Sequence, residues 1–168
     1  GKSVEQVAAI VERLRADGDD ALIATRATPE QVVVLDAMSP TGSGAGVRTW
    51  RHREPSGHRV AVVAAGTSDI PVADECRLTL VALGHDAWPV TDVGVAGLHR
   101  LTAALPELER ADLIVAVAGM EGALPTVLAG LVRQPIIAVP TSVGYGAGLE
   151  GVTALLSMMA SCSPGISV

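Results

Sequence analysis

Hydrophobic residues at the start of the chain recur with the spacing of an amphipathic helix. Over residues 4–14 they form one stripe, made of Val4, Val7, Val11 and Leu14. Ser3 precedes this stripe and Gln6 follows three residues later, which is the spacing of a capping box. The pattern therefore predicts a first helix that begins directly after Ser3.

A second helix is predicted from Pro29, after a short apolar strand within 21–28. Thr28 precedes Pro29, and Gln31 completes a second capping box. Residues 39–46 (SPTGSGAG) are turn formers and predict a linker, whereas the alternation over 47–54 favours an exposed strand. We expect residues 1–46 to form a small N-terminal α/β region with a linker, and residues 47–168 to form a larger domain.

From Arg59 onward, short apolar runs alternate with helical patterns. Near-continuous apolar runs are typical of strands in a parallel sheet that is covered on both faces. With right-handed crossovers, this order predicts a three-layer α/β/α sandwich. The expected strands lie within 59–66, 86–95, 111–119, 134–140 and 166–168, and the expected long helices within 67–83, 120–132 and 148–161.

Composition and charge narrow the functional classes. Hydrophobic residues make up 49% of the chain and aromatic residues only 2%, so the core must consist of Ala, Val, Leu and Ile. The net charge of −6, without a Lys/Arg cluster, argues against nucleic acid and anionic membranes as partners. No apolar run is long enough to span a bilayer and no signal peptide is visible, so we expect a cytoplasmic protein.

Two cysteines, Cys76 and Cys162, lie far apart and match no zinc spacing. We therefore expect neither a disulfide framework nor a metal site. Cys162 follows a predicted helix and precedes a strand, where a thiol is exposed enough to react. An inert small side chain is the alternative for any lone cysteine, and it is the interpretation that we favour for Cys76 in the middle of a helix.

Ligands of open parallel sheets bind at the carboxyl ends of the strands, which directs attention to the loops there. In the first loop Gly66 permits a tight turn, and Thr67, Ser68 and Asp69 open a helix whose free N–H groups suit a phosphate. Capping alone also explains Ser68 or Asp69. The second loop contains Asp92, Gly94, His99 and Arg100, which could present an acid, a base and a phosphate-binding cation. A helix start with His99 and Arg100 on its surface explains these residues equally well.

The third and fourth loops are rich in glycine. In the third, Glu121 stands between glycines and apolar residues, where partial burial would suit a general acid or base; a favourable charge at a helix N-terminus is the alternative. The fourth has the composition expected where the backbone approaches a ligand, or of a flexible hinge. The candidate binding residues of these loops are Gly119, Met120 and Gly122, followed by Pro140, Thr141, Ser142, Gly144, Tyr145 and Gly146.

Taken in order, these motifs resemble the LarB family, pyridinium-3,5-biscarboxylic acid mononucleotide synthase. The resemblance runs through GKSVEQ, AAGTSDIPVADE, DVGVAGLHRL, VAGMEGALPTVLAGLV, IIAVPTSVGYGAG and LLSMMASCSPGISV, and it is densest over 60–168. That family is in turn similar to aminoimidazole ribonucleotide carboxylase, with which it shares the Ser-Asp loop, the Leu98-His99-Arg100 segment and the AGxxxxLP loop. The resemblance implies an AIR-carboxylase-like catalytic domain whose last strand is cut short here.

The resemblance implies that the pyridinium ring of nicotinic acid adenine dinucleotide is carboxylated at C5 and that the phosphoanhydride is hydrolysed, releasing AMP. The product would serve nickel-pincer cofactor biosynthesis. Cys162 would be the covalent nucleophile, because thiolate addition makes the electron-poor ring electron-rich enough to attack CO2. Glu121 is the first candidate for removing the C5 proton, and Asp69 is the second.

The resemblance also sets the expected partners. CO2 or bicarbonate is the co-substrate, no cofactor is tightly bound, Mg²⁺ assistance to phosphoanhydride cleavage stays open, and the protein is expected to be a homo-oligomer between dimer and octamer. One alternative is an aminoimidazole ribonucleotide carboxylase or mutase. Those enzymes carry a catalytic histidine directly before the Leu-Pro pair, where this chain has Ala123. The other alternative is a non-catalytic nucleotide-binding domain.

Overall fold

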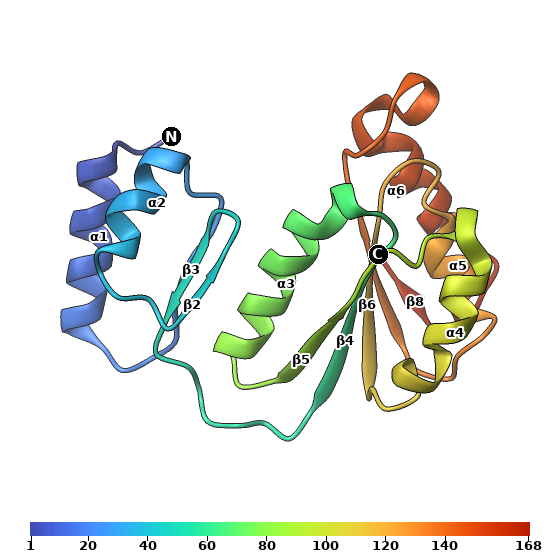
Figure 1. Cartoon of the computed structure of the whole chain (residues 1–168), viewed down its shortest axis with the longest axis horizontal. Helices are drawn as coiled ribbons and strands as arrows, with labels where there is room; N and C mark the ends of the chain where they lie inside the picture. Colours follow the sequence, from blue (N-terminus) through green and yellow to red (C-terminus); the bar gives the residue numbers. More distant parts are fainter. The chain divides into compact units, whose positions relative to one another are not determined.

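Figure 1 shows the computed structural model of the protein, which describes residues 1–168. The chain divides into two compact units, which we describe separately. One comprises Gly1–Gly57 with Asp74–Asp86, and the other comprises His58–Ala73 with Ala87–Val168. None of the helices combines the length and the apolar character that crossing a bilayer requires.

The first unit contains two whole helices, residues 74–82 of a third helix, and a three-stranded antiparallel sheet. Helix α1 (Val4–Asp17) and helix α2 (Pro29–Asp36) both begin at capping boxes, built on Ser3 and Thr28, so both predicted helix starts are confirmed. The strands are ordered β1-β3-β2. Their bounds are β1 (Leu22–Ala24), β2 (Gly42–Gly44) and β3 (Val47–Trp50).

Two predictions for this region are wrong. Residues 42–44, expected in a linker, form β2, and β3 is buried along its whole length although an exposed strand was expected. The reason is a two-residue hairpin turn between Gly44 and Val47, in which Gly46 adopts a φ of 72°. The pairing of β3 with β1 and β2 places residues 47–50 in the sheet of this unit.

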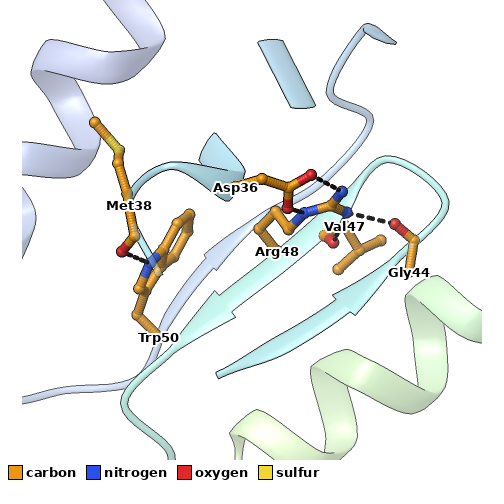
Figure 2. Close-up of polar contacts among 6 residues, drawn as sticks. All are labelled: Asp36, Met38, Gly44, Val47, Arg48 and Trp50. Atoms are coloured by element: carbon orange, nitrogen blue, oxygen red, sulfur yellow. Dashed lines mark hydrogen bonds and ion pairs between the residues drawn. The ribbon is translucent and has the colours of Figure 1, made fainter. Parts of the chain in front are cut away.

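A buried arginine holds this small unit together (Figure 2). The Arg48 guanidinium forms an ion pair with Asp36 at the end of α2 and donates to the backbone oxygens of Gly44 and Val47, each at 2.6 Å. The same contact lowers the pKa of the Asp36 carboxyl below its ordinary value, because the hydrogen bond from Arg48 favours the ionised form. Trp50 donates its indole N–H to Met38 O at 3.1 Å and joins the apolar core of the unit.

The second unit contains a five-stranded sheet with the order β5-β4-β6-β7-β8 (Figure 1). Parallel pairing joins β4 to β6, β6 to β7, and β7 to β8. Because the strands are parallel, their carboxyl ends share one edge of the sheet and their amino ends the other. The strands are β4 (Arg59–Ala64), β5 (Asp86–Val90), β6 (Leu113–Ala118), β7 (Ile136–Pro140) and β8 (Ile166–Ser167).

Helices connect these strands, and several begin with a short 3-10 turn. Leu101, Leu128 and Met158, from α4, α5 and α6, pack in one core cluster with alternate strand residues such as Val63 and Ala116. The expected three-layer α/β fold with a parallel sheet is confirmed. The helical segments are η1 (Thr67–Asp69), α3 (Ile70–Ala82), η2 (Val95–Gly97), α4 (Leu98–Leu108), α5 (Ala123–Ala129), η3 (Gly146–Gly151) and α6 (Val152–Met159).

An ion pair joins β4 to the start of β6 at the amino edge of the sheet. The Arg59 guanidinium donates to Asp112 Oδ1 at 2.7 Å, and the Arg59 backbone N–H donates to Asp112 Oδ2 at 2.8 Å. Hydrogen bonding from Arg59 lowers the pKa of Asp112 from 3.8 to about 2. The ionised carboxylate therefore stabilises the fold above its ordinary pKa, and this contribution is lost as the pH falls toward 2.

We expect Asp112→Asn to lower the free energy of unfolding at pH 6, and the difference from the wild type to shrink as the pH is lowered from 4 toward 2. Urea unfolding at several pH values measures this. Asp19→Asn, which removes an exposed carboxylate that forms no ion pair in the structure, is the control. A difference between wild type and Asp112→Asn that is equally large at pH 6 and pH 3 would contradict the assignment.

Candidate functional site

A cavity of about 410 Å³ opens at the carboxyl ends of β4, β5, β6 and β7. All the residues that line it belong to the second unit. The first and second loops contribute Ala65, Gly66, Thr67, Ser68, Asp69, Asp92, Gly94, Val95 and Ala96. The third loop and the start of α5 contribute Ala118, Gly119, Met120, Glu121, Ala123 and Leu124, and Val143 comes from the fourth loop.

Asp69 is the buried carboxylate of this cavity, with 3% of its surface exposed. Its Oδ2 accepts a hydrogen bond from Gly66 N at 3.0 Å, which closes the turn between β4 and η1. Its Oδ1 accepts a hydrogen bond from the Thr141 hydroxyl at 2.7 Å. The capping interpretation and the functional interpretation of Asp69 are therefore compatible, because the same side chain caps the turn and lines the cavity.

Glycines allow the loops around the cavity to approach one another closely. A Cβ on Gly119 would lie 2.2 Å from Val143 O and 2.7 Å from Thr141 Oγ1. A Cβ on Gly94 would lie 2.6 Å from Ala65 O, where the loops after β4 and β5 meet. Met120 N in the third loop donates a hydrogen bond to Val143 O in the fourth loop, at 2.7 Å.

Glu121 lies at the mouth of the cavity and is exposed. The partial burial expected for it from the neighbouring apolar residues is wrong. The preceding Met120 has a φ of 53°, and Gly122 has a φ of 64° at the start of α5. Of the two candidate bases, Asp69 is buried and Glu121 is exposed.

The second loop reaches the cavity through Asp92 and Gly94, but not through its basic residues. The Arg100 guanidinium turns back and donates to Asp92 O at 2.6 Å and to Asp92 Oδ1 at 3.4 Å. His99 is exposed on α4. Neither basic side chain lines the cavity. The cation and the base expected here for the substrate therefore lie outside it in this chain.

The fourth loop lines the cavity through Val143 alone. Thr141 is 5% exposed, and its hydroxyl is directed to Asp69. Tyr145, by contrast, is 82% exposed. The candidates of this loop that the structure leaves outside the cavity are Pro140, Thr141, Ser142, Gly144, Tyr145 and Gly146, and Gly122 of the third loop also lies outside it.

Cys162 lies in the loop between α6 and β8. Both of its neighbours contact α5: the Thr126 hydroxyl donates to Ser161 Oγ at 2.9 Å, and the Ser163 hydroxyl donates to Thr126 O at 3.1 Å. The loop ends at Gly165, whose carbonyl accepts from Ile136 N at 2.8 Å, at the first residue of β7. Cys162 is exposed, as expected, and it is outside the cavity of its own chain. Burial raises the pKa of the Cys76 thiol and makes that cysteine the less reactive one.

Apolar residues of the cavity were missed by the sequence analysis. Ala65 and Ala118 directly adjoin strand ends, so the position of these ends was a usable signal. Val95, Ala96, Leu124 and Val143 carry no chemical signature, and only the folded loops bring them together. They form an apolar wall beside Asp69.

The lining has no imidazole and no thiol, so carboxylates are the groups available in it for proton transfer. Ala123 stands in the lining before the Leu-Pro pair. No three His, Cys, Asp or Glu side chains are grouped so that they could hold a metal ion.

We expect Gly119→Ala to lower the free energy of unfolding by about 1–3 kcal/mol, because its Cβ cannot fit against Val143 O without separating the third and fourth loops. Chemical denaturation measures the change. Gly148→Ala is the matched control, because nothing lies within 4 Å of a Cβ there. Equal stabilities of the two alanine variants would contradict the close approach.

Comparison with known proteins agrees with this geometry. The family model described as AIR carboxylase matches residues 59–168. An uncharacterized protein of Methanocaldococcus jannaschii is 52% identical over 112 residues, which are 66% of this chain and 43% of that protein. The N5-carboxyaminoimidazole ribonucleotide mutase of the same organism is 33% identical over 112 residues, covering 65% of this chain and 66% of the mutase.

The chain thus spans less than half of the first relative and about two thirds of the second. The family match includes the whole parallel sheet and every loop of the cavity. Because the matched residues are more than half of the chain, this protein belongs to the AIR carboxylase family.

Proposed function

We propose that this protein carboxylates the pyridinium ring of nicotinic acid adenine dinucleotide and hydrolyses its phosphoanhydride, as the LarB-type motifs imply. One observation carries the proposal: the cavity offers carboxylates for proton transfer but no imidazole. Ala123 lines it at the position where the aminoimidazole carboxylases that the motif resembles carry a histidine. The apolar wall made by Val95, Leu124 and Val143 suits a flat aromatic ring.

The reaction needs a nucleophile, because a pyridinium ring is too electron-poor to attack CO2. A thiolate forms a C–S bond to a ring carbon, and the ring becomes a neutral dihydropyridine. C5 then attacks CO2 and forms the new C–C bond. A base removes the C5 proton, the electron pair returns to the ring, and the C–S bond breaks to release the thiolate. Attack of water on the phosphoanhydride then yields AMP and the dicarboxylated mononucleotide.

Two of the three carboxylates that line the cavity, Asp69 and Glu121, divide the proton work. Asp69 is buried beside the apolar wall, so it is the better placed of the two to take a proton from a ring bound there. Glu121 stands at the solvent-exposed mouth, where it suits proton exchange with water. Glu121 was the first candidate base from the sequence, but the burial of Asp69 makes Asp69 the preferred one.

The thiolate in this scheme comes from Cys162 of a second copy of the chain. In its own chain neither Cys162 nor Cys76 lines the cavity. Helix α6, which runs from the cavity edge toward Cys162, exposes Val152, Leu155, Leu156 and Met159. Such an apolar stripe on a soluble domain suits packing against another subunit, so the proposal includes a homo-oligomer.

We expect Cys162→Ala to abolish incorporation of labelled bicarbonate into the nucleotide product while leaving dinucleotide binding intact. Asp69→Asn should slow the reaction by about 10²–10⁴-fold, because it removes the base. Mass spectrometry of the product measures both effects, and Cys76→Ala is the matched cysteine control. If Cys162→Ala formed product at the rate of the wild type, the covalent mechanism would be contradicted.

We expect activity to return when Cys162→Ala and Asp69→Asn chains are co-expressed, because a mixed pair contains one site with both groups intact. Random mixing of two chain types in dimers leaves about a quarter of all sites complete. Each variant alone is the control. If the mixture forms no carboxylated product although native mass spectrometry shows mixed oligomers, the neighbouring subunit does not supply the thiol.

A mutase acting on N5-carboxyaminoimidazole ribonucleotide is the second candidate, favoured by the 33% identity to an enzyme of that name. That chemistry moves a carboxyl group and a proton and needs no thiol. Turnover of this ribonucleotide by both the wild type and Cys162→Ala would establish it. Tight dinucleotide binding without turnover of either substrate would instead indicate a binding domain.

A further inference from the structure

Thr141 makes a buried hydrogen bond that the proposed reaction scheme does not yet use. It lies directly after β7, in the loop expected to contact the substrate, yet it is 5% exposed and outside the cavity lining. Its hydroxyl donates to Asp69 Oδ1 at 2.7 Å, across 72 positions of the sequence. The hydroxyl also accepts from Val143 N at 3.4 Å. Both its donor and its acceptor capacity are therefore committed inside the protein.

The two hydrogen bonds to Asp69 determine the orientation of its carboxylate. Gly66 N holds Oδ2 and the Thr141 hydroxyl holds Oδ1, so rotation of the side chain would break at least one bond in a buried place. An ionised carboxylate accepts about four hydrogen bonds, so each oxygen keeps accepting capacity for a proton that arrives from the cavity. Asp69 is thus fixed in direction and still able to act as a base.

The close approach of the third loop keeps Thr141 in this position. A Cβ on Gly119 would lie 2.7 Å from Thr141 Oγ1, so the glycine is what permits the hydroxyl to lie behind the cavity wall. On the other side, a Cβ on Gly151 would lie 2.6 Å from Thr141 O. Backbone on both sides therefore confines Thr141, and its hydroxyl has one carboxylate within reach.

We infer that Thr141 is a positioning residue that acts through Asp69: its hydroxyl aims the carboxylate that takes the C5 proton of the ring. This inference rests on the proposed function. In the proton step the C5–H bond breaks, the proton goes to an oxygen of Asp69, and the electron pair stays with the ring, which then expels the thiolate. Thr141 itself exchanges no proton and touches no substrate.

Steady-state kinetics of Thr141→Val and Thr141→Ser test the inference. The valine keeps the shape but lacks the hydroxyl, and we expect kcat to fall by about 10²-fold with KM little changed, because a misdirected base costs about that much. The serine restores the hydroxyl and should recover most of the rate. Thr79→Val, which removes a hydroxyl bonded to Glu75 O on α3, is the matched control and should have the rate of the wild type. A rise of KM at constant kcat in Thr141→Val would instead show substrate binding and overturn the inference.

A double-mutant cycle separates action through Asp69 from a general loss of structure. In an Asp69→Asn background, Thr141→Val should cause no further loss of rate, because the group through which it acts is already disabled. If Thr141→Val lowered kcat by the same factor in the wild-type and Asp69→Asn backgrounds, the inference would be overturned.

Crystal structures of the two threonine variants give a readout that needs no reaction. We expect the Asp69 carboxylate to be rotated in Thr141→Val and unchanged in Thr141→Ser. If the wild type fails to carboxylate the dinucleotide, the proposed function is wrong, and these structures still decide the positioning role. An unchanged Asp69 in Thr141→Val would overturn it.

Discussion

The cavity depends on backbone segments that lie closer together than side chains permit. A Cβ at Gly119 would meet Val143 O at 2.2 Å, and a Cβ at Gly94 would meet Ala65 O at 2.6 Å. These contacts bring the loops after four parallel strands around one space of about 410 Å³. Parallel pairing brings the strand ends to one edge of the sheet, and the glycines then let the loops close around it.

The residues around Asp69 determine the orientation and the burial of its carboxylate. Asp69 closes its own turn through Gly66 N and is aimed by Thr141, while an apolar wall lies beside it. The other two lining carboxylates, Asp92 and Glu121, are exposed. Under the proposed function, Asp69 is the base that removes the ring proton after a thiol has activated the ring, and Glu121 exchanges protons with water.

Local signals in the sequence were sufficient for the helices, the sheet and the cavity loops. Ser3 and Thr28 marked helix starts because a capping box is a contact within four residues. Apolar runs marked the parallel strands, and the loops after them contain Gly66, Asp69, Asp92 and Gly119, which line the cavity. The hairpin at Gly46 was missed, since β2 reads Gly-Ser-Gly and has no strand signature.

Contacts between distant segments could not be predicted from such signals. Thr141 belongs to a polar glycine-rich loop, and nothing in that loop announces a partner 72 residues away. Cys162 is exposed, as expected, but its loop does not bring it into the lining of the cavity of its own chain. Glu121 is exposed although glycines and apolar residues surround it in the sequence, and the left-handed backbone of the preceding Met120 is unusual for a residue of that type.

The most direct test of this account is a crystal structure of the protein with nicotinic acid adenine dinucleotide bound. We expect the pyridinium ring to lie in the carboxyl-edge cavity, against Asp69, with the sulfur of Cys162 from another subunit beside the ring. A ring bound next to Cys162 of the same chain, or a dinucleotide bound outside the cavity, would contradict it.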